Sequence, residues 1–144
     1  MPFAITREVR GTCLCLHVQS AARALARRFD DAFRGLGLTN GQFSMLMSLN
    51  RPDPARMAEV AAVLAMDRTT LTAALKPLAR RGLVKIGVDR ADKRSRLLTL
   101  TAAGRKLLRQ ALPIWRGEHA TLEQFLSNGR SDPEQLRAVL RALS

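Results

Sequence analysis

The chain has 144 residues, a formal net charge of +12 and a pI near 11.5, a balance that favours nucleic acid as a partner. Its length suits about one domain, and its apolar content of 47% excludes a disordered chain. Aromatic residues make up only 4% and tyrosine is absent, which disfavours RNA-binding sheets that stack bases on aromatic side chains.

The start of the chain is mixed in polarity and lacks the apolar run of a signal peptide. No stretch approaches the roughly 20 apolar residues of a membrane-spanning helix. The two cysteines are too few for a disulfide framework. We therefore expect a cytoplasmic protein with no membrane partner.

Apolar residues recur at spacings of three and four over residues 9–33, which predicts one long amphipathic helix. The apolar stripe consists of Leu14, Val18, Ala21, Leu25, Phe29 and Ala32. Gly35 and Gly37 end the pattern. A stripe of this length needs an apolar partner, either the rest of this chain or a second copy.

Two short helices are predicted next. Thr39 and Gln42 fit a capping box that starts a helix over residues 40–49. A turn follows at residues 50–54, and residues 57–64 form the next short helix. Residues 65–67 are too few for more than a tight connection to the segment after them.

A further helix is predicted over residues 68–80, with Asp67 as its N-cap. Pro77 lies inside it, and we expect a bend or an early end of the helix there. Its outer face carries short hydroxyls and cations, the side chains that contact base edges and phosphates in a major groove: Arg68, Thr69, Thr70, Thr72 and Lys76. An ordinary solvated helix face has the same composition.

Gly82 suits the position after a helix end, and residues 83–88 and 96–100 read as two strands. The turn between them is basic, because Asp89 and Asp92 are outnumbered by cations in and beside it: Arg90, Lys93, Arg94 and Arg96. Cations on a protruding hairpin can reach a minor groove and its flanking phosphates. The alternative is a solvated charged turn.

Thr101 is predicted to cap a helix that runs to about residue 125, with a kink at Pro113, and Pro133 begins a last helix. The predicted fold is mainly α with a small β-hairpin wing: a winged helix-turn-helix with N- and C-terminal dimerisation helices. The expected division is a helical dimerisation region at residues 1–36 and 101–144, and a DNA-binding region at residues 37–100, which we call the reader. A two-fold dimer would present two readers to one duplex.

Residues 39–116 resemble the MarR family of bacterial transcriptional regulators. The matching segments are MAEVA at 57–61, DRTTLT at 67–72, LKPLARRGLV at 75–84, DRADKRS at 89–95 and LTLTAAG at 98–104. The resemblance implies an obligate homodimer on a palindromic double-stranded DNA operator, with residues 68–80 in the major groove and residues 89–96 in the minor groove. It also implies that Asp92 shapes the wing and that Arg94 contacts DNA.

Members of this family commonly repress nearby genes and release DNA when a small aromatic or anionic ligand binds between the dimerisation helices and the reader. Others respond to cysteine oxidation or to metal. Here Cys13, Cys15 and His17 are the candidates for ligand or redox control. On one helix, positions two apart point about 200° away from each other, so a disulfide within the chain would need that helix unwound. One cysteine could instead bridge across a dimer or react alone, but we expect both to be small core residues. No spacing indicates a metal site or a cofactor.

The leading hypothesis is a dimeric, sequence-specific DNA-binding regulator, released by a small molecule. One alternative is a winged-helix protein–protein interaction module, which the basic wing argues against. Another is a regulator controlled by oxidation of Cys13 and Cys15. Phosphate loops, nucleophile elbows and metal-ligand clusters are absent from the sequence, so we expect no enzymatic activity.

Overall fold

A computed structural model describes residues 2–144 and shows a mainly helical chain with one small antiparallel sheet, which confirms the predicted fold class. The helices are α1 (Ala4–Thr12), α2 (Leu14–Phe33), the 3₁₀ turn η1 (Arg34–Leu36), α3 (Asn40–Ser48), α4 (Met57–Val63), α5 (Arg68–Arg80), α6 (Ala102–Ser127) and α7 (Pro133–Leu143). The strands are β1 (Ala55–Arg56), β2 (Val84–Val88) and β3 (Arg96–Leu100). Among the helices of this range, none is long and apolar enough to cross a membrane.

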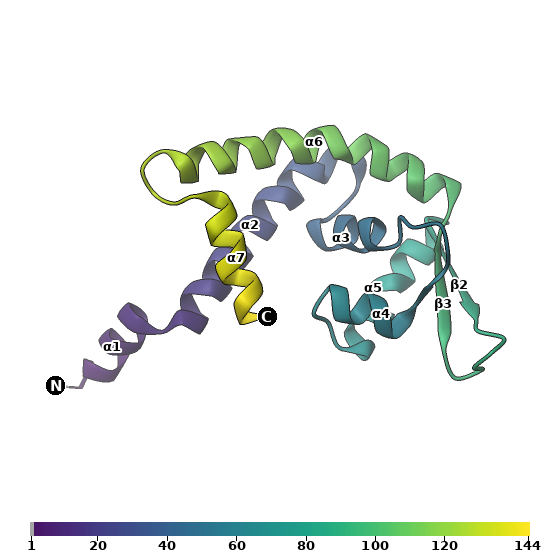
Figure 1. Cartoon of the computed structure of the whole chain (residues 1–144), viewed down its shortest axis with the longest axis horizontal. Helices are drawn as coiled ribbons and strands as arrows, with labels where there is room; N and C mark the ends of the chain where they lie inside the picture. Colours follow the sequence, from purple (N-terminus) through teal and green to yellow (C-terminus); the bar gives the residue numbers. More distant parts are fainter. Residues whose placement is uncertain (1) are drawn as a thin grey trace.

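Helix α6 forms an arch along the top of the molecule in Figure 1. Helix α2 lies beneath part of it, and the reader lies below the end at which α6 begins. The β2–β3 hairpin projects from the reader at the end remote from the N-terminus. Helices α2 and α6 contact each other, and α3 contacts both of them. The reader is therefore attached to the long helices through α3 and through the start of α6.

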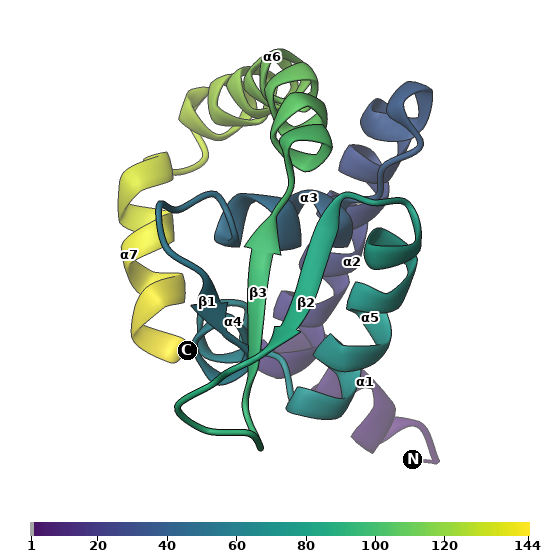
Figure 2. The same ribbon diagram turned by 90° about the vertical axis from the view of Figure 1, so that its right-hand side faces the viewer.

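The sheet has three strands in the order β1-β3-β2, not the lone hairpin predicted from the sequence (Figure 2). The hairpin register pairs Val84 with Leu100 and Val88 with Arg96, while Ala55 of β1 pairs with Leu98. Strand β1 is two residues long and follows a proline-rich turn, so it carries no alternating pattern to detect. It anchors the other edge of β3, which stabilises a hairpin that would be marginal alone.

The prediction of one continuous helix over residues 9–33 is wrong, because the helix is interrupted at Cys13. Cys13 has an extended backbone with ψ of 108°, and α2 begins immediately after it. The residues before the break are weak helix formers: Gly11 has high backbone entropy, and the Thr12 hydroxyl donates to the Glu8 carbonyl at 2.8 Å. Helix α1 has no buried residue within the chain.

Neither internal proline ends its helix. Helix α5 continues past Pro77 to Arg80, so of the two outcomes expected there, a bend or an early end, the early end does not occur. Leu75 and Leu78 flank the proline and are fully buried, and this packing holds the turn that lacks one backbone hydrogen bond. Helix α6 likewise passes through Pro113 as one arched helix of 26 residues.

Aromatic rings form the contact between the reader and the long helices. Phe33 of α2 stacks on Phe43 of α3 with ring centroids 4.9 Å apart, and Phe43 lies 6.5 Å from the ring of Trp115 in α6. Arg28 and Glu118 add an ion pair of 2.7 Å between α2 and α6. Phe33 is fully buried and Phe43 nearly so, so both rings belong to the core, and Phe43 also lines a hollow between α3 and α6.

Candidate nucleic-acid interface

Helix α5 is positioned by its buried face and by its first turn. Leu71, Leu75 and Leu78 are fully buried against the rest of the reader. Asp67 caps the helix: its Oδ1 accepts from the Thr70 N–H at 2.8 Å and its Oδ2 accepts from the Thr70 hydroxyl at 2.7 Å. Those two donors, the hydroxyl first, hold the pKa of the Asp67 carboxyl below its ordinary value of 3.8.

The exposed face of α5 gathers four of the five residues predicted for this helix. Around a shallow surface hollow of about 390 Å³ lie Arg68, Thr69, Thr72, Ala73 and Lys76. Thr70 is not among them, because its side chain turns back to the Asp67 cap. Thr72 donates its hydroxyl proton to the Arg68 carbonyl at 2.7 Å, which leaves its oxygen as an outward acceptor.

Two aspartates make hydrogen bonds within the wing. Asp92 Oδ1 accepts from the Arg94 N–H at 3.0 Å, and the Asp92 carbonyl accepts from the Ser95 N–H at 2.9 Å. Asp89 is buried, accepts from the Ala91 N–H at 2.9 Å and lies 3.8 Å from the Arg56 guanidinium. The sequence pattern gave no sign of that contact, because it depends on strand β1.

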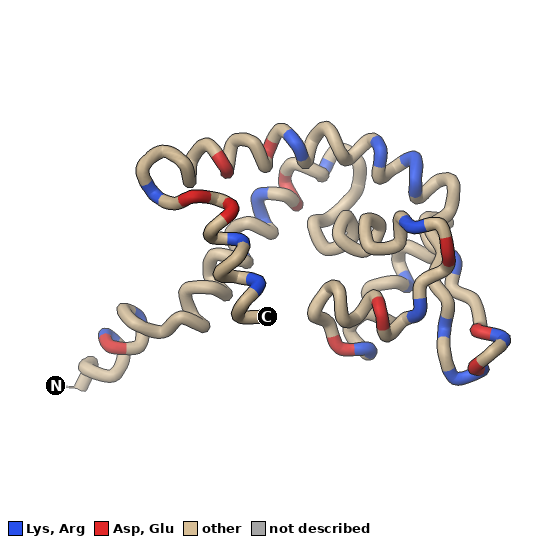
Figure 3. Tube along the Cα trace, in the orientation of Figure 1, with Lys and Arg blue, Asp and Glu red and all other residues tan. Residues whose placement is uncertain are grey.

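Four cations lie in or beside the wing, and all of them are exposed: Arg90, Lys93, Arg94 and Arg96. Figure 3 shows that basic residues gather at the end of the hairpin, where they alternate with two acidic residues. None of the four makes an ion pair with a carboxylate of residues 2–144. Arg96 donates to the Lys93 carbonyl at 3.2 Å, so one of its N–H donors is used within the loop.

One hydrogen bond joins the two predicted DNA-contacting elements. Arg68, the first residue of α5, donates through Nη2 to the carbonyl of Arg94 in the wing at 3.2 Å. The sequence predicted both residues as DNA contacts but not that they touch each other. The separation of 26 positions along the chain leaves no local pattern by which to find this contact.

The candidate redox residues lie at the junction of α1 and α2. Cys15 is exposed and Cys13 is half-buried, so the prediction that both are core residues is wrong for the single chain. Cys13 Sγ accepts from the Leu16 N–H at 3.4 Å, and Gln19 Nε2 donates to Cys15 Sγ at 3.0 Å. The ring of His17 donates from Nδ1 to the Cys13 carbonyl at 2.7 Å. Within residues 2–144, no group of three or more His, Cys, Asp or Glu side chains is placed to hold a metal ion.

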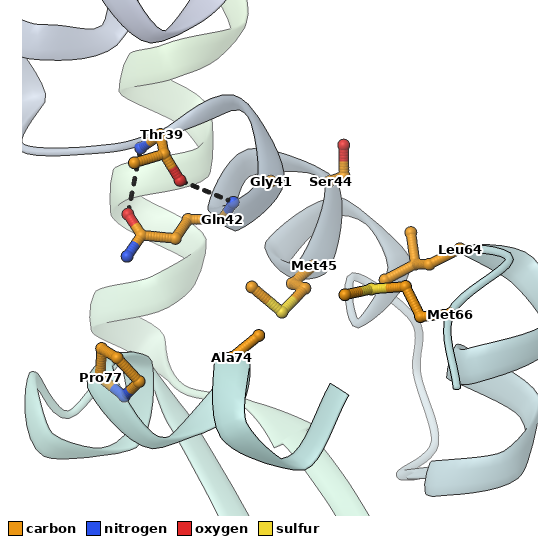
Figure 4. Close-up of a pocket in the computed structure, with 9 residues that line it drawn as sticks. All are labelled: Thr39, Gly41, Gln42, Ser44, Met45, Leu64, Met66, Ala74 and Pro77. Carbon is orange, nitrogen blue, oxygen red and sulfur yellow. Dashed lines mark hydrogen bonds between the residues drawn. The ribbon is translucent and has the colours of Figure 1, made fainter. Parts of the chain in front are cut away.

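Two hollows border α3. The first, of about 440 Å³, lies between α3 and α5; Met45, Met66 and Ala74 line it beside the Thr39–Gln42 capping box (Figure 4). All of its lining residues are uncharged. The second, of about 330 Å³, lies between α3 and α6 and has two cations on its rim, Arg105 and Arg109, which the sequence analysis did not single out.

Comparisons with known proteins agree with this arrangement. The sequence profile of the MarR family matches residues 36–95. The transcriptional regulator HosA of Escherichia coli O157:H7 is 33% identical over 100 residues, which span 69% of this chain and 71% of HosA. The M. tuberculosis transcriptional regulator MosR in complex with DNA superimposes with a TM-score of 0.77 at 35% identity, covering 91% of this chain and 93% of MosR.

The fold itself is close to that of a MarR variant from E. coli bound to operator DNA, with a TM-score of 0.81 at 23% identity over 94% of this chain and 96% of that one. These similarities are to transcriptional regulators and not to enzymes. With the winged helix-turn-helix and its basic face, they show that the chain belongs to the MarR family of DNA-binding transcriptional regulators.

Proposed function

We propose that this protein is a homodimeric repressor that binds a palindromic DNA operator and leaves it when a small ligand binds. The observation that carries the proposal is the exposed face of α5, with its hydroxyls and cations, linked by Arg68 to a basic wing. A helix of this kind suits the major groove, and a thin basic hairpin suits the adjacent minor groove.

The proposed DNA contacts of α5 and the wing differ with the chemistry of their side chains. Thr69, Thr72 and Lys76 lie along the exposed face of α5 and are assigned to base edges and adjacent phosphates. Arg90, Lys93 and Arg96 are assigned to phosphates, and Arg94 to the minor groove. Thr70 supports this face through the cap of α5 more than through its own hydroxyl, whose proton is bonded to Asp67.

Dimerisation is proposed through residues 1–36 and 101–144. Large apolar side chains there are exposed in the single chain: Phe3 at 70%, Ile5 at 77%, Leu14 at 73% and Leu143 at 65%. In addition, α2, α6 and α7 enclose an apolar hollow of about 450 Å³. Apolar surface of this extent on three neighbouring helices favours a second copy of the chain.

The ligand is proposed to bind in the hollow between α3 and α6. Phe43, Leu108 and Leu112 supply an apolar floor for an aromatic ring, and Arg105 and Arg109 supply the positive charge that attracts an anion. Because α3 belongs to the reader and α6 to the dimerisation region, a ligand between them would change how the two parts sit. Arg109→Ala should raise the concentration of salicylate, used as the probe anion, that is needed to displace DNA.

Oxidation of Cys13 and Cys15 is the second candidate for control. The break at Cys13 favours it, because the two thiols are not both held on one regular helix. Hydrogen peroxide would take two electrons and two protons from the pair, giving one disulfide and two waters. If Cys13→Ser and Cys15→Ser variants lose DNA at the same peroxide concentration as the parent protein, this control is excluded.

Selection of duplexes from a random library at physiological salt tests the proposed function. We expect a palindrome with half-sites about one helical turn apart, and repression of a promoter that carries it. Arg94→Ala should weaken binding to this operator and reduce the salt slope without dissociating the dimer. Recovery of sequence-blind, salt-sensitive binding alone would contradict a sequence-reading repressor.

A further inference from the structure

Arg68 holds the wing to the recognition helix. Its Nη2 donates to the carbonyl of Arg94, 3.2 Å away, across 26 positions of the chain. The side chain is exposed and makes no ion pair within residues 2–144. A guanidinium has five N–H donors in a fixed plane, so a bond to one carbonyl leaves the others free for a phosphate.

The wing has little else to hold its tip. The hydrogen bonds of Asp89, Asp92 and Arg96 within the loop join it to itself. The Arg56–Asp89 pair of 3.8 Å reaches only the base of the loop, beside strand β2. Within the described part of the chain, Arg68 therefore makes the one hydrogen bond between wing residues 90–95 and an element outside the hairpin.

We propose that Arg68 is a positioning residue that fixes the distance between the recognition helix and the wing tip, and so sets how well the wing enters the minor groove. The inference rests on the proposed DNA-binding role of the wing. A hairpin loop held from α5 presents Arg94 in one place when α5 is seated in the major groove. Without Arg68 the loop samples several positions, and contact with the minor groove costs the entropy of ordering it.

Hydrogen exchange of the wing amides in the free protein tests, without DNA, whether the hydrogen bond from Arg68 holds the wing in place. We compare Arg68→Ala with Lys76→Ala, which removes the same charge from the same exposed helix face, where Lys76 makes no ion pair or side-chain hydrogen bond within residues 2–144. Exchange of the Arg94 and Ser95 amides should become about 2- to 10-fold faster in Arg68→Ala and stay unchanged in Lys76→Ala. Equal exchange rates in both variants would overturn the inference, whatever the protein does with DNA.

A double-mutant cycle on the selected operator tests the functional part. If Arg68 acts through the wing, Arg94→Ala should weaken binding much less in an Arg68→Ala background than in the parent protein. If Arg68 is only a phosphate contact, the two fold-losses should multiply. Arg68→Gln serves as a second variant should Arg68→Ala fold poorly.

The base composition under the wing gives a readout that a general loss of stability would not move. Arg68→Ala should flatten the dependence of affinity on A·T or G·C pairs at the minor-groove flank, and leave the preferences under α5 in place. A uniform loss on every sequence would mean that Arg68 does not position the wing.

Discussion

Replacement of Gly104 by alanine should destabilise the protein, although the residue lies inside a helix. Gly104 is buried in the first turn of α6, and its N–H donates to the hydroxyl oxygen of Thr101 at 3.0 Å. A Cβ built on it would lie 2.3 Å from the Leu83 carbonyl oxygen and 2.6 Å from Leu100 Cδ1. The backbone of Leu83 cannot swing aside as a flexible side chain can, so the start of α6 must move away from β2.

The magnitude follows from two opposed effects. Alanine should favour the helix over glycine by about 1 kcal/mol. Overpacking a well-packed site costs about 1–3 kcal/mol, and a clash with backbone lies at the upper end of that range. We expect a net loss of about 2 kcal/mol, which lowers the urea midpoint by about 1 M if the slope is about 2 kcal/mol per M.

Gly41→Ala is the matched control, because a Cβ at Gly41 in α3 would meet nothing within 4 Å and Gly41 lies away from the proposed dimer surface. It should raise the free energy of unfolding by about 0.5–1 kcal/mol. Both variants should be unfolded in urea at the same protein concentration, since a dimer's midpoint depends on concentration. A Gly104→Ala variant as stable as the Gly41→Ala variant would refute the close packing of α6 on Leu83.

Three further predictions concern the reader. Ala65→Gly should raise the free energy of unfolding by about 0.5–1 kcal/mol, because Ala65 has a left-handed φ of 51°; Ala62→Gly, within helix α4, should lower it by a similar amount. Asp67 has a lowered pKa, so its cap contributes stability above pH 3.8 and loses that contribution as the pH falls through the folded-state value; urea midpoints between pH 2 and pH 5 should vary less in Asp67→Asn. Thr72→Ala should change the selected sequence more than the overall affinity, whereas Thr70→Ala should mainly lower stability through the cap; the reverse pattern would contradict the orientation of α5.

The sequence was sufficient for the elements whose signals are local. The Thr39–Gln42 capping box forms as predicted, with hydrogen bonds of 3.0 and 3.1 Å, and Gly82 takes the left-handed φ of 70° expected after a helix end. These features need only neighbouring residues, so spacing alone reveals them. The predicted positions of α5 and of both wing strands hold for the same reason.

Features that depend on distant residues were missed. Strand β1 forms because β3 offers a free edge beside Ala55, and two residues show no periodicity. The break at Cys13 is a local exception: Gly11 and Thr12 precede it, and the apolar stripe that predicted the helix begins only after it, at Leu14. Contacts such as Arg68 with the Arg94 carbonyl require the fold to be known, and the same holds for the hollow between α3 and α6.

The net charge of the protein does not equal the number of cations that can contact DNA, because some cations are paired with carboxylates. Several cations are engaged by carboxylates away from the reader face, among them Arg28 with Glu118 and Arg137 with Glu123. These pairs hold helices together and have little positive charge left for a phosphate. The cations of α5 and the wing lack carboxylate partners within residues 2–144. Their positive charge is therefore available to phosphates, although the net charge of the protein is spread along the chain. Arg68 and Arg96 also donate to backbone carbonyls of the wing, but a carbonyl is neutral, so both guanidinium groups keep the positive charge on which the salt dependence of DNA binding rests.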